Sequence, residues 1–381
     1  MRRIKNWAAA VVLGLSLVSR AFGQMAGDEV VVIVEKTDLK HEATVVETTY
    51  RGNYLTVREV NGNWLWVDND GTRGWLQRNH VILASQALNY FTDELRRNPK
   101  DATALVARAI AWRDKGELTN AIRDCTDAIA INPEWSWAYK IRGNAWKAKK
   151  EYDLAIADYE EGMRLDPKDN QFYFNRGNCH RAKKNYDKAI ADYTEAIRLN
   201  PKSAENFLGR GSSYLGKEEY DKALADFRVV VELDPKNVKG HTYQIAVFRK
   251  REEFQRAATA YEEAFRLFPN NASVHNSTAW FLATCRCDEF RNGHRAMELA
   301  KRAVELGTKD GKTPNYILGT LAAAYAEAGD FESAVAAQQR AVDATPSEAQ
   351  ASYLTRLELY KSGQPYRDVP KTEVGTTTAA K

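Results

Sequence analysis

The stretch FNRGNCHRAKKNYDKAIADYTEAIRLNP, from Phe174 to Pro201, decides the fold because its pattern recurs along the chain every 34 residues. Its final proline belongs to a series at this spacing, which comprises Pro99, Pro133, Pro167, Pro201, Pro235 and Pro269. Alanine stands twelve residues before each of these prolines, and an aromatic residue stands eight before most of them. A fixed period of this length indicates stacked two-helix repeats.

Small and large side chains alternate in step with this period. An aromatic or histidine stands 21 residues before most of the prolines, three places after a small residue such as Gly143 or Gly177. Small residues let two helices approach closely, and large ones fill the space beside them. The pattern resembles the tetratricopeptide repeat. That resemblance implies a mainly α protein, an α-α superhelix of about seven repeats.

The repeats can be placed individually. Five regular ones start near Ala102, Ser136, Asn170, Ala204 and Val238. A sixth keeps the pattern with an inter-helix loop about five residues longer, and a seventh runs from Asn315 to Pro346. We expect a capping helix on each side, at residues 85–98 and 348–361. The predicted solenoid therefore covers residues 85–362.

Residues 24–84 change from helical period to alternation, which predicts a small closed sheet of about five strands. The strongest signals are Tyr54–Val60, the Asn61-Gly62 hairpin pair and the segment WLWV at residues 64–67. This region resembles a bacterial SH3-like barrel, a family that binds cell-wall glycopeptide or short peptides. Trp64 and Trp66 share one face of their strand. They are candidate ligand contacts, and the alternative places both in the small core and its rim.

The two ends of the chain have distinct compositions. Residues 1–23 combine basic Arg2, Arg3 and Lys5 with a 12-residue apolar run and small residues around position 23, as in a signal peptide. An uncleaved anchor is the alternative, although the run is short for a membrane helix. After cleavage we expect no stable membrane insertion. Residues 363–381 lack an apolar period, which predicts a disordered tail.

The charge balance bears on the partners. The first 23 residues hold four basic residues and no acidic one, and removing these four from the total of 55 leaves 51 basic against 51 acidic residues. A chain without net charge has no overall field to concentrate nucleic acid, so we expect no nucleic-acid partner. Four irregularly spaced cysteines do not form a disulfide framework of the small secreted kind.

The sequence matches motifs for catalysis and metal binding only weakly. Residues 307–313 approach a phosphate-binding loop but have three residues between the glycines where four are required. Cys285 and Cys287 lack a second cysteine pair to complete a tetrahedral metal site. We therefore predict no enzyme activity, no cofactor and no metal. The alternative, a catalytic site assembled from distant repeats, stays open.

Arginines recur at the period of 34, at Arg108, Arg142, Arg176 and Arg210. An anionic binding track is one interpretation. We favour the other, in which each arginine packs beside the tight helix contact and pairs with a carboxylate of its own or the next helix.

A second stripe predicts the binding surface. On the first helix of the second regular repeat, four residues spaced three and four apart face away from the core: Trp137, Lys140, Asn144 and Lys147. The same places one repeat later include Phe174, Asn178 and Arg181, and one repeat earlier Thr103, Val106, Ile110 and Arg113. Basic heads, amides and aromatics suit an extended peptide carrying carboxylates. A solvated charged face is the alternative.

The chaperone-binding members of the resembled family use a carboxylate clamp of similar layout. Lys140, Asn144 and Asn175 match three of its five places, whereas Glu205 and Gly209 stand where that family has basic residues. The resemblance therefore implies peptide binding without chaperone specificity.

Together these features predict an exported, periplasmic or extracellular scaffold that binds protein or peptide partners in the concave groove. The alternative is a cell-wall glycopeptide module acting through the SH3-like barrel.

Export has a direct test. We expect the mature chain to begin near Gln24, because the small residues that suit a signal peptidase end at Gly23. N-terminal sequencing of the native protein measures this, and a chain that begins at Met1 would contradict it.

Overall fold

The computed structural model describes residues 27–41, 44–69 and 71–368. The predicted signal peptide lies outside these residues. The chain divides into two compact units, with the boundary after Pro201, and each is described by itself. The first holds a β-sheet and three helix pairs, and the second holds four helix pairs and a final helix.

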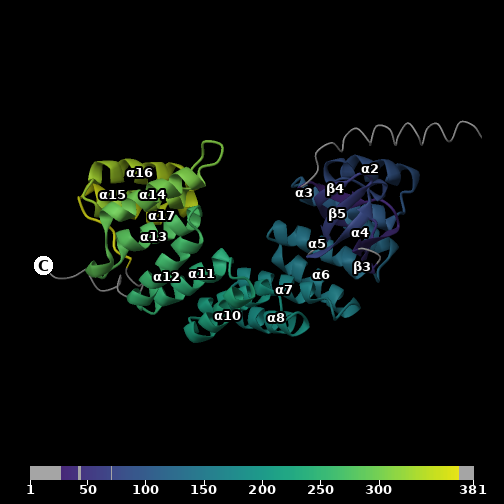
Figure 1. Cartoon of the computed structure of the whole chain (residues 1–381), viewed down its shortest axis with the longest axis horizontal. Coiled ribbons are helices and arrows are strands. Elements are labelled where there is room, and N and C mark those ends of the chain that lie inside the picture. The colour runs from purple at the N-terminus through teal and green to yellow at the C-terminus, as the bar shows by residue number, and fades with distance from the viewer. Residues whose placement is uncertain (1–26, 42–43, 70, 369–381) are drawn as a thin grey trace, which may run out of the picture. The chain divides into compact units, whose positions relative to one another are not determined.

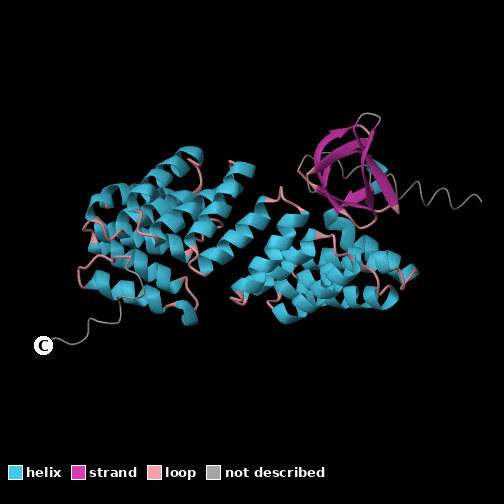
Figure 2. Ribbon diagram, turned by 90° about the horizontal axis from the view of Figure 1, so that it is seen from below, coloured by secondary structure: helices cyan, strands magenta, loops and turns pink. Residues whose placement is uncertain are grey.

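The sheet is antiparallel and has seven strands in the order β3-β2-β6-β5-β4-β1-β7. Its strands are magenta in Figure 2. Their bounds are β1 (Glu29–Val32), β2 (Lys36–His41), β3 (Thr44–Tyr50), β4 (Tyr54–Asn61), β5 (Trp64–Asn69), β6 (Thr72–Gln77) and β7 (Val81–Leu83). Leu39, Leu55, Leu65 and Leu76 are buried in its core. Gly74 lets β6 approach β2, since a Cβ there would lie 2.7 Å from that of Leu39.

The sheet differs from the prediction in two respects. About five strands were expected, and the structure has seven, because the polar segments β2 and β3 also pair. A closed barrel was expected, yet β3 and β7 stand at the two ends of the hydrogen-bonded order in the described residues. The predicted hairpin is present, with Asn61 paired to Trp64 across Gly62 and Asn63.

Helices of the first unit follow the sheet (Figure 1). They are α2 (Ala84–Arg97), α3 (Ala102–Asp114), α4 (Leu118–Ile131), α5 (Ser136–Ala148), α6 (Tyr152–Leu165), α7 (Asn170–Ala182) and α8 (Tyr186–Leu199). The single helix α2 confirms the predicted capping helix at this end.

The second unit continues the same helical period. Its helices are α9 (Ala204–Gly216), α10 (Tyr220–Leu233), α11 (Val238–Lys250), α12 (Phe254–Leu267), α13 (Ala272–Thr284), α14 (Gly293–Gly307), α15 (Asn315–Glu327), α16 (Phe331–Asp343) and α17 (Ala351–Lys361). The five regular repeats start where the sequence predicted. The longer loop of the sixth, residues 285–292, is confirmed.

In the pairs α5–α6, α7–α8 and α9–α10, a glycine on the first helix packs against an aromatic ring on the second. A Cβ added to Gly143 would lie 2.7 Å from the Tyr159 ring, and one added to Gly177 would lie 3.2 Å from the Tyr193 ring. Both tyrosines are fully buried. No larger side chain fits at these two glycines without moving an aromatic ring.

The recurring arginines are structural, which confirms the favoured interpretation. Each donates at least two hydrogen bonds to an aspartate sixteen residues later, on the second helix of its own pair. These pairs are Arg108 with Asp124, Arg142 with Asp158, Arg176 with Asp192 and Arg210 with Asp226. The aspartates are buried, so the arginines neutralise them inside the helix pairs.

The segment after α17 differs from the prediction. Residues 363–381 were expected to be a disordered tail, but residues 363–368 are described and contact the second unit. Tyr366 lies against Trp280, and Arg367 forms an ion pair with Glu327. Apolar periodicity detects helices and strands, and this segment is neither, so its side-chain contacts left no periodic signal. Residues 369–381 lie outside the described part of the chain.

Gly177→Trp tests the tight contact. The indole would overlap Tyr193, so we expect the substitution to lower the free energy of unfolding by about 1–3 kcal/mol or more. Ala182→Trp, at an exposed site on the same helix, is the matched control. Urea unfolding followed by circular dichroism measures both, and equal curves for the two variants would contradict the packing described.

Candidate functional site

The predicted binding stripe lies on α5 and α7 of the first unit. We call its residues the α5–α7 face: Trp137, Lys140, Asn144, Lys147, Phe174, Asn178 and Arg181. All are half-buried except Arg181, which is exposed. The buried face of α5 carries Ala138, Ile141 and Ala145 instead. The 3.6-residue period therefore separates the stripe from the core.

Two asparagines of this face are oriented by tyrosines from the core. The Tyr159 hydroxyl donates to Asn144 Oδ1 at 2.8 Å, and the Tyr193 hydroxyl donates to Asn178 Oδ1 at 2.8 Å. Burial raises the pKa of both tyrosines, so the hydroxyls stay protonated donors. Among the described residues, neither Asn144 Nδ2 nor Asn178 Nδ2 makes a hydrogen bond. Both NH2 groups are therefore available to a ligand carbonyl.

The two lysines of the face have partners within the protein. Lys140 Nζ lies 2.8 Å from Asp169 Oδ2 and 4.4 Å from the centre of the Trp137 ring. Lys147 Nζ donates to Asn175 Oδ1 at 2.6 Å, and burial lowers its pKa. Both ammonium groups are thus engaged by side chains of the protein, which makes the face less basic than the sequence predicted.

Arg181 is the most accessible cation of the α5–α7 face. Its Nε donates to the Tyr193 hydroxyl at 3.3 Å, a contact that leaves the charge uncompensated by a carboxylate. Phe174 lies beside the same tyrosine, with the ring centres 6.0 Å apart. An exposed guanidinium beside an aromatic ring suits a ligand carboxylate next to an apolar side chain.

Two of the four residues of the stripe predicted on α3, Val106 and Ile110, are buried, whereas Thr103 and Arg113 are half-buried. Val106 and Ile110 are 2% and 4% exposed. The turn between β3 and β4 lies on this helix, and Gly52 approaches so closely that an added Cβ would be 3.0 Å from that of Ala107. Val106 and Ile110 therefore do not form an exposed stripe, although both line the edge of a pocket beside the turn. Apolar residues stand here where α5 has Lys140 and Asn144, and that difference was the available signal.

Arg51 fixes this turn to the helices. Its guanidinium lies 2.7 Å from Asp101 and 2.9 Å from Glu94, and its side chain is 9% exposed. Burial by itself lowers the pKa of Arg51, but the hydrogen bond and field of Asp101 raise it overall. The buried guanidinium therefore stays charged and holds the sheet against α2 and α3.

A pocket of about 450 Å³ lies where the turn meets the helices. Its walls include Tyr50 at the end of β3, Asn53 of the following turn, Ile110 from α3, and Trp135 and Trp137 from around the start of α5. Trp137 also belongs to the α5–α7 face, so the pocket adjoins that face. Its size and aromatic walls suit one large apolar side chain of a ligand.

The sheet tryptophans lie outside its core. Leu65 and Val67 of β5 are buried, whereas Trp64 is 42% exposed and Trp66 is half-buried. The Trp66 ring centre is 5.6 Å from that of His41 and 5.3 Å from that of Trp75. The three rings form a row on the outer face of the sheet, so neither tryptophan lies in the core itself, and Trp66 lies at its rim.

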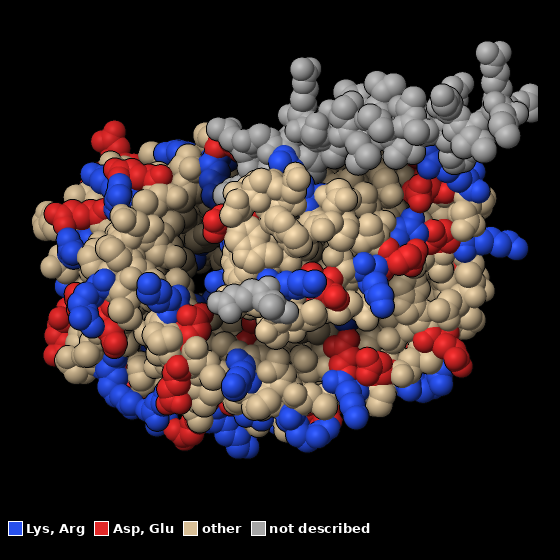
Figure 3. Space-filling model, turned by 45° about the vertical axis from the view of Figure 1, so that its right-hand side comes forward, with Lys and Arg blue, Asp and Glu red and all other residues tan. Residues whose placement is uncertain are grey.

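Other candidates from the sequence are separate from this face. Cys285 is buried and Cys287 half-buried, and both are free thiols. In residues 27–41, 44–69 and 71–368, no three His, Cys, Asp or Glu side chains are grouped as metal ligands. The helices of these ranges include none with the length and apolar character needed to cross a bilayer. Basic and acidic side chains are intermingled on the face seen in Figure 3.

Family models described as tetratricopeptide repeat match residues 84–134, 171–203, 204–237, 245–284 and 316–348. These ranges make up about half of the chain. The chain is therefore a tetratricopeptide repeat protein. The matches begin where the sheet ends, so they do not extend to the SH3-like resemblance. A search of curated proteins found no match.

Solved structures show the same fold. A tetratricopeptide repeat protein from Parabacteroides merdae ATCC 43184 is 15% identical over 72% of this chain and 99% of its own, with a TM-score of 0.51. Yeast Tom70 is 17% identical over 73% of this chain and 59% of its own, with a TM-score of 0.57. At these identities the likeness concerns the fold alone.

Gly52→Ala tests the contact between the sheet and α3. Its matched control is Gly62→Ala, because both glycines have positive φ but only Gly52 has a neighbour that an added Cβ would meet. The left-handed backbone costs each variant about 1–2 kcal/mol. We expect a larger loss for Gly52→Ala, together with faster hydrogen exchange in α3. Equal losses, with exchange in α3 unchanged, would contradict the contact.

Proposed function

We propose that this protein is a non-enzymatic scaffold that binds an extended peptide, or an extended segment of a protein, along the α5–α7 face. Tetratricopeptide repeat proteins generally mediate protein and peptide binding. The observation that carries the proposal is the pair of asparagines, Asn144 and Asn178, each oriented by a buried tyrosine. Their NH2 groups are donors held in place before a ligand arrives.

Each part of the face has a role in this proposal. The two amides bind backbone carbonyls of the peptide, an interaction that every sequence offers. The pocket beside Trp137 takes one large apolar side chain. Arg181 pairs with a carboxylate of the ligand. Specificity therefore comes from the pocket and Arg181, and general affinity from the amides.

The face does not support chaperone recognition. Asn175, which matches one place of the carboxylate clamp, is 6% exposed and accepts a hydrogen bond from Lys147. Lys140, which matches another, is paired with Asp169. Two of the three matching groups are thus engaged within the protein.

We further propose that the protein acts outside the cytoplasm of a bacterium, in the periplasm or beyond. The signal-like residues 1–23 support this location. A second candidate function fits it, the binding of cell-wall glycopeptide by the SH3-like sheet. The exposed Trp64 and the row formed by His41, Trp66 and Trp75 favour this candidate, because aromatic rings offer flat apolar surfaces to sugars.

The peptide proposal is tested with a displayed library of random decapeptides. We expect the full chain to enrich peptides that combine an acidic residue with a large apolar one. A variant with three substitutions, Lys140→Ala, Asn144→Ala and Arg181→Ala, should bind the selected peptides with at least tenfold lower affinity, measured by fluorescence polarisation. The helical circular dichroism should not change.

The control likewise removes two basic residues and one asparagine, at exposed positions away from the face, with Lys168→Ala, Asn185→Ala and Lys188→Ala. We expect it to alter affinity less than twofold. Undiminished binding by the first triple variant would show that the peptides bind another surface of the protein.

The glycopeptide candidate predicts that the protein co-sediments with purified peptidoglycan. Trp64→Ala should reduce the bound fraction severalfold, since it removes the most exposed ring. Val60→Ala, another exposed apolar residue of the sheet, is the control. Equal sedimentation of Trp64→Ala and the unsubstituted chain would exclude the tryptophan as a contact.

A further inference from the structure

The segment that follows α17 lies across the first helices of three helix pairs in the second unit. We call residues 364–368, with the sequence QPYRD, the C-terminal segment. It is neither helix nor strand. Its contacts reach Arg249 on α11, Trp280 and Thr284 on α13, and Glu327 on α15. One short segment thus contacts three helices that are far apart in the sequence.

Two of these contacts fall at helix positions that form the predicted binding stripe in the first unit. Asn144 and Lys147 are the ninth and twelfth residues of α5. Trp280 is the ninth residue of α13, and Arg249 is the twelfth of α11. Thr284 and Glu327 are the thirteenth and last residues of α13 and α15, one place beyond the stripe. We call Arg249, Trp280, Thr284 and Glu327 the α11–α15 face.

Tyr366 is held by an aromatic ring and a cation. Its ring centre lies 5.7 Å from that of Trp280, at an interplanar angle of 43°. The Arg356 guanidinium is 5.5 Å from the Trp280 ring centre and 5.7 Å from the Tyr366 ring centre. The phenol ring therefore gains both aromatic packing and cation–π attraction.

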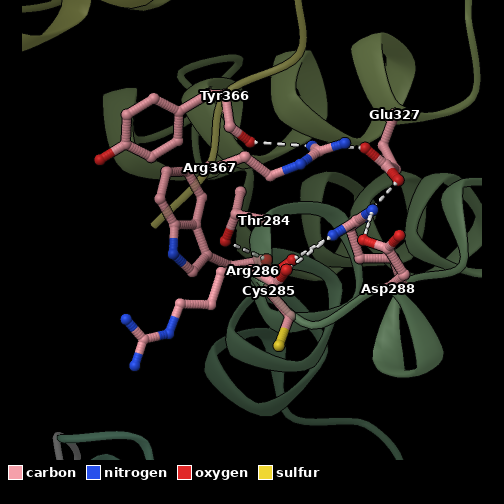
Figure 4. A network of polar contacts seen from close by, with 9 residues as sticks. Thr284, Cys285, Arg286, Asp288, Glu327, Tyr366 and Arg367 are labelled. Atoms are coloured by element: carbon pink, nitrogen blue, oxygen red, sulfur yellow. Dashed lines mark hydrogen bonds and ion pairs between the residues drawn. The ribbon is translucent and has the colours of Figure 1, made fainter. Parts of the chain in front are cut away.

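The two following residues are recognised by opposite charges. Arg367 Nη1 lies 2.6 Å from Glu327 Oε2, whose side chain is 12% exposed (Figure 4). Asp368 forms an ion pair with Arg249. An ion pair with a carboxylate as buried as Glu327 is screened less by salt than one at the surface. The order of charges in the segment therefore matters to its binding.

A main-chain contact accompanies these side chains. The Asp368 N–H donates to the Thr284 carbonyl at 2.9 Å. Thr284 is the last residue of α13, where carbonyls have no partner within the helix. The segment thus meets a free acceptor, an aromatic ring, an anion and a cation, which are the contacts of peptide recognition.

We propose that the α11–α15 face is a second peptide-binding surface, selective for an extended segment with an aromatic, a basic and an acidic residue in that order, and that the C-terminal segment occupies it as a tethered competitor. A short tether gives an effective concentration on the order of millimolar. A weakly binding external peptide is therefore excluded, and one with higher affinity displaces the segment. The proposal concerns the second unit and does not rest on the function proposed for the α5–α7 face.

The test uses a fluorescein-labelled peptide, SGQPYRDV, copied from residues 362–369. It is titrated against the full chain and against a full-length variant whose segment lacks these side chains, with Pro365→Gly, Tyr366→Ser, Arg367→Gly and Asp368→Ser. We expect the variant to bind the peptide at least tenfold more tightly than the unsubstituted chain. The charge-exchanged peptide SGQPYDRV is the matched control and should bind the variant at least tenfold more weakly.

A further substitution locates the peptide. Adding Glu327→Gln to the variant should lower its affinity for SGQPYRDV at least fivefold, because the charge opposite Arg367 is lost. Equal binding of the peptide to the variant and to the unsubstituted chain, or equal binding of the two peptides, would overturn the proposal. Hydrogen exchange on the unsubstituted chain gives an independent result, since rapid exchange of the Asp368 amide would overturn it as well.

Discussion

The close approach of the two helices within each pair is the constraint on which the rest of the structure depends. Where Gly143 and Gly177 stand, the rings of Tyr159 and Tyr193 lie directly against the first helix. The hydrogen bonds from Arg142 to Asp158 and from Arg176 to Asp192 join the same two helices at a second place. Because each helix pair buries little surface alone, stacking on neighbouring pairs supplies the remaining stability.

The same contact builds the proposed binding site. A tyrosine that packs on glycine extends its hydroxyl to the asparagine next to that glycine, so a core residue orients a surface residue. In the pair formed by α9 and α10 the ring is Phe227, which has no hydroxyl, and Ser212 stands in the asparagine's place. The Ser212 hydroxyl donates to the Leu208 carbonyl of its own helix instead. The orientation of Asn144 and Asn178 therefore depends on a tyrosine fifteen residues later in the same helix pair.

Segments outside the repeats cover the corresponding helix faces near both ends of the array. The turn at Gly52 lies on α3 in the first unit, and the C-terminal segment lies on α11, α13 and α15 in the second. Both segments use buried or partly buried ion pairs, from Arg51 to Asp101 and from Arg367 to Glu327. The Arg51 guanidinium, 9% exposed, must meet a carboxylate to avoid an uncompensated buried charge, whereas Glu327 also pairs with Arg291 at 3.0 Å.

The sequence by itself determined the helix pairs, because a period of 34 residues and its glycines, aromatics and prolines are local features that repeat. It also determined the stripe on α5 and α7, since a helix separates its faces by a known angle. Only the tertiary structure decided that Val106 and Ile110 are covered, that Lys140 is paired, and that residues 364–368 bind the second unit. Arg51 meets a partner 50 residues away, and Asp368 meets one 119 residues away. Contacts of that range depend on where folding brings distant segments together, and no local period records them.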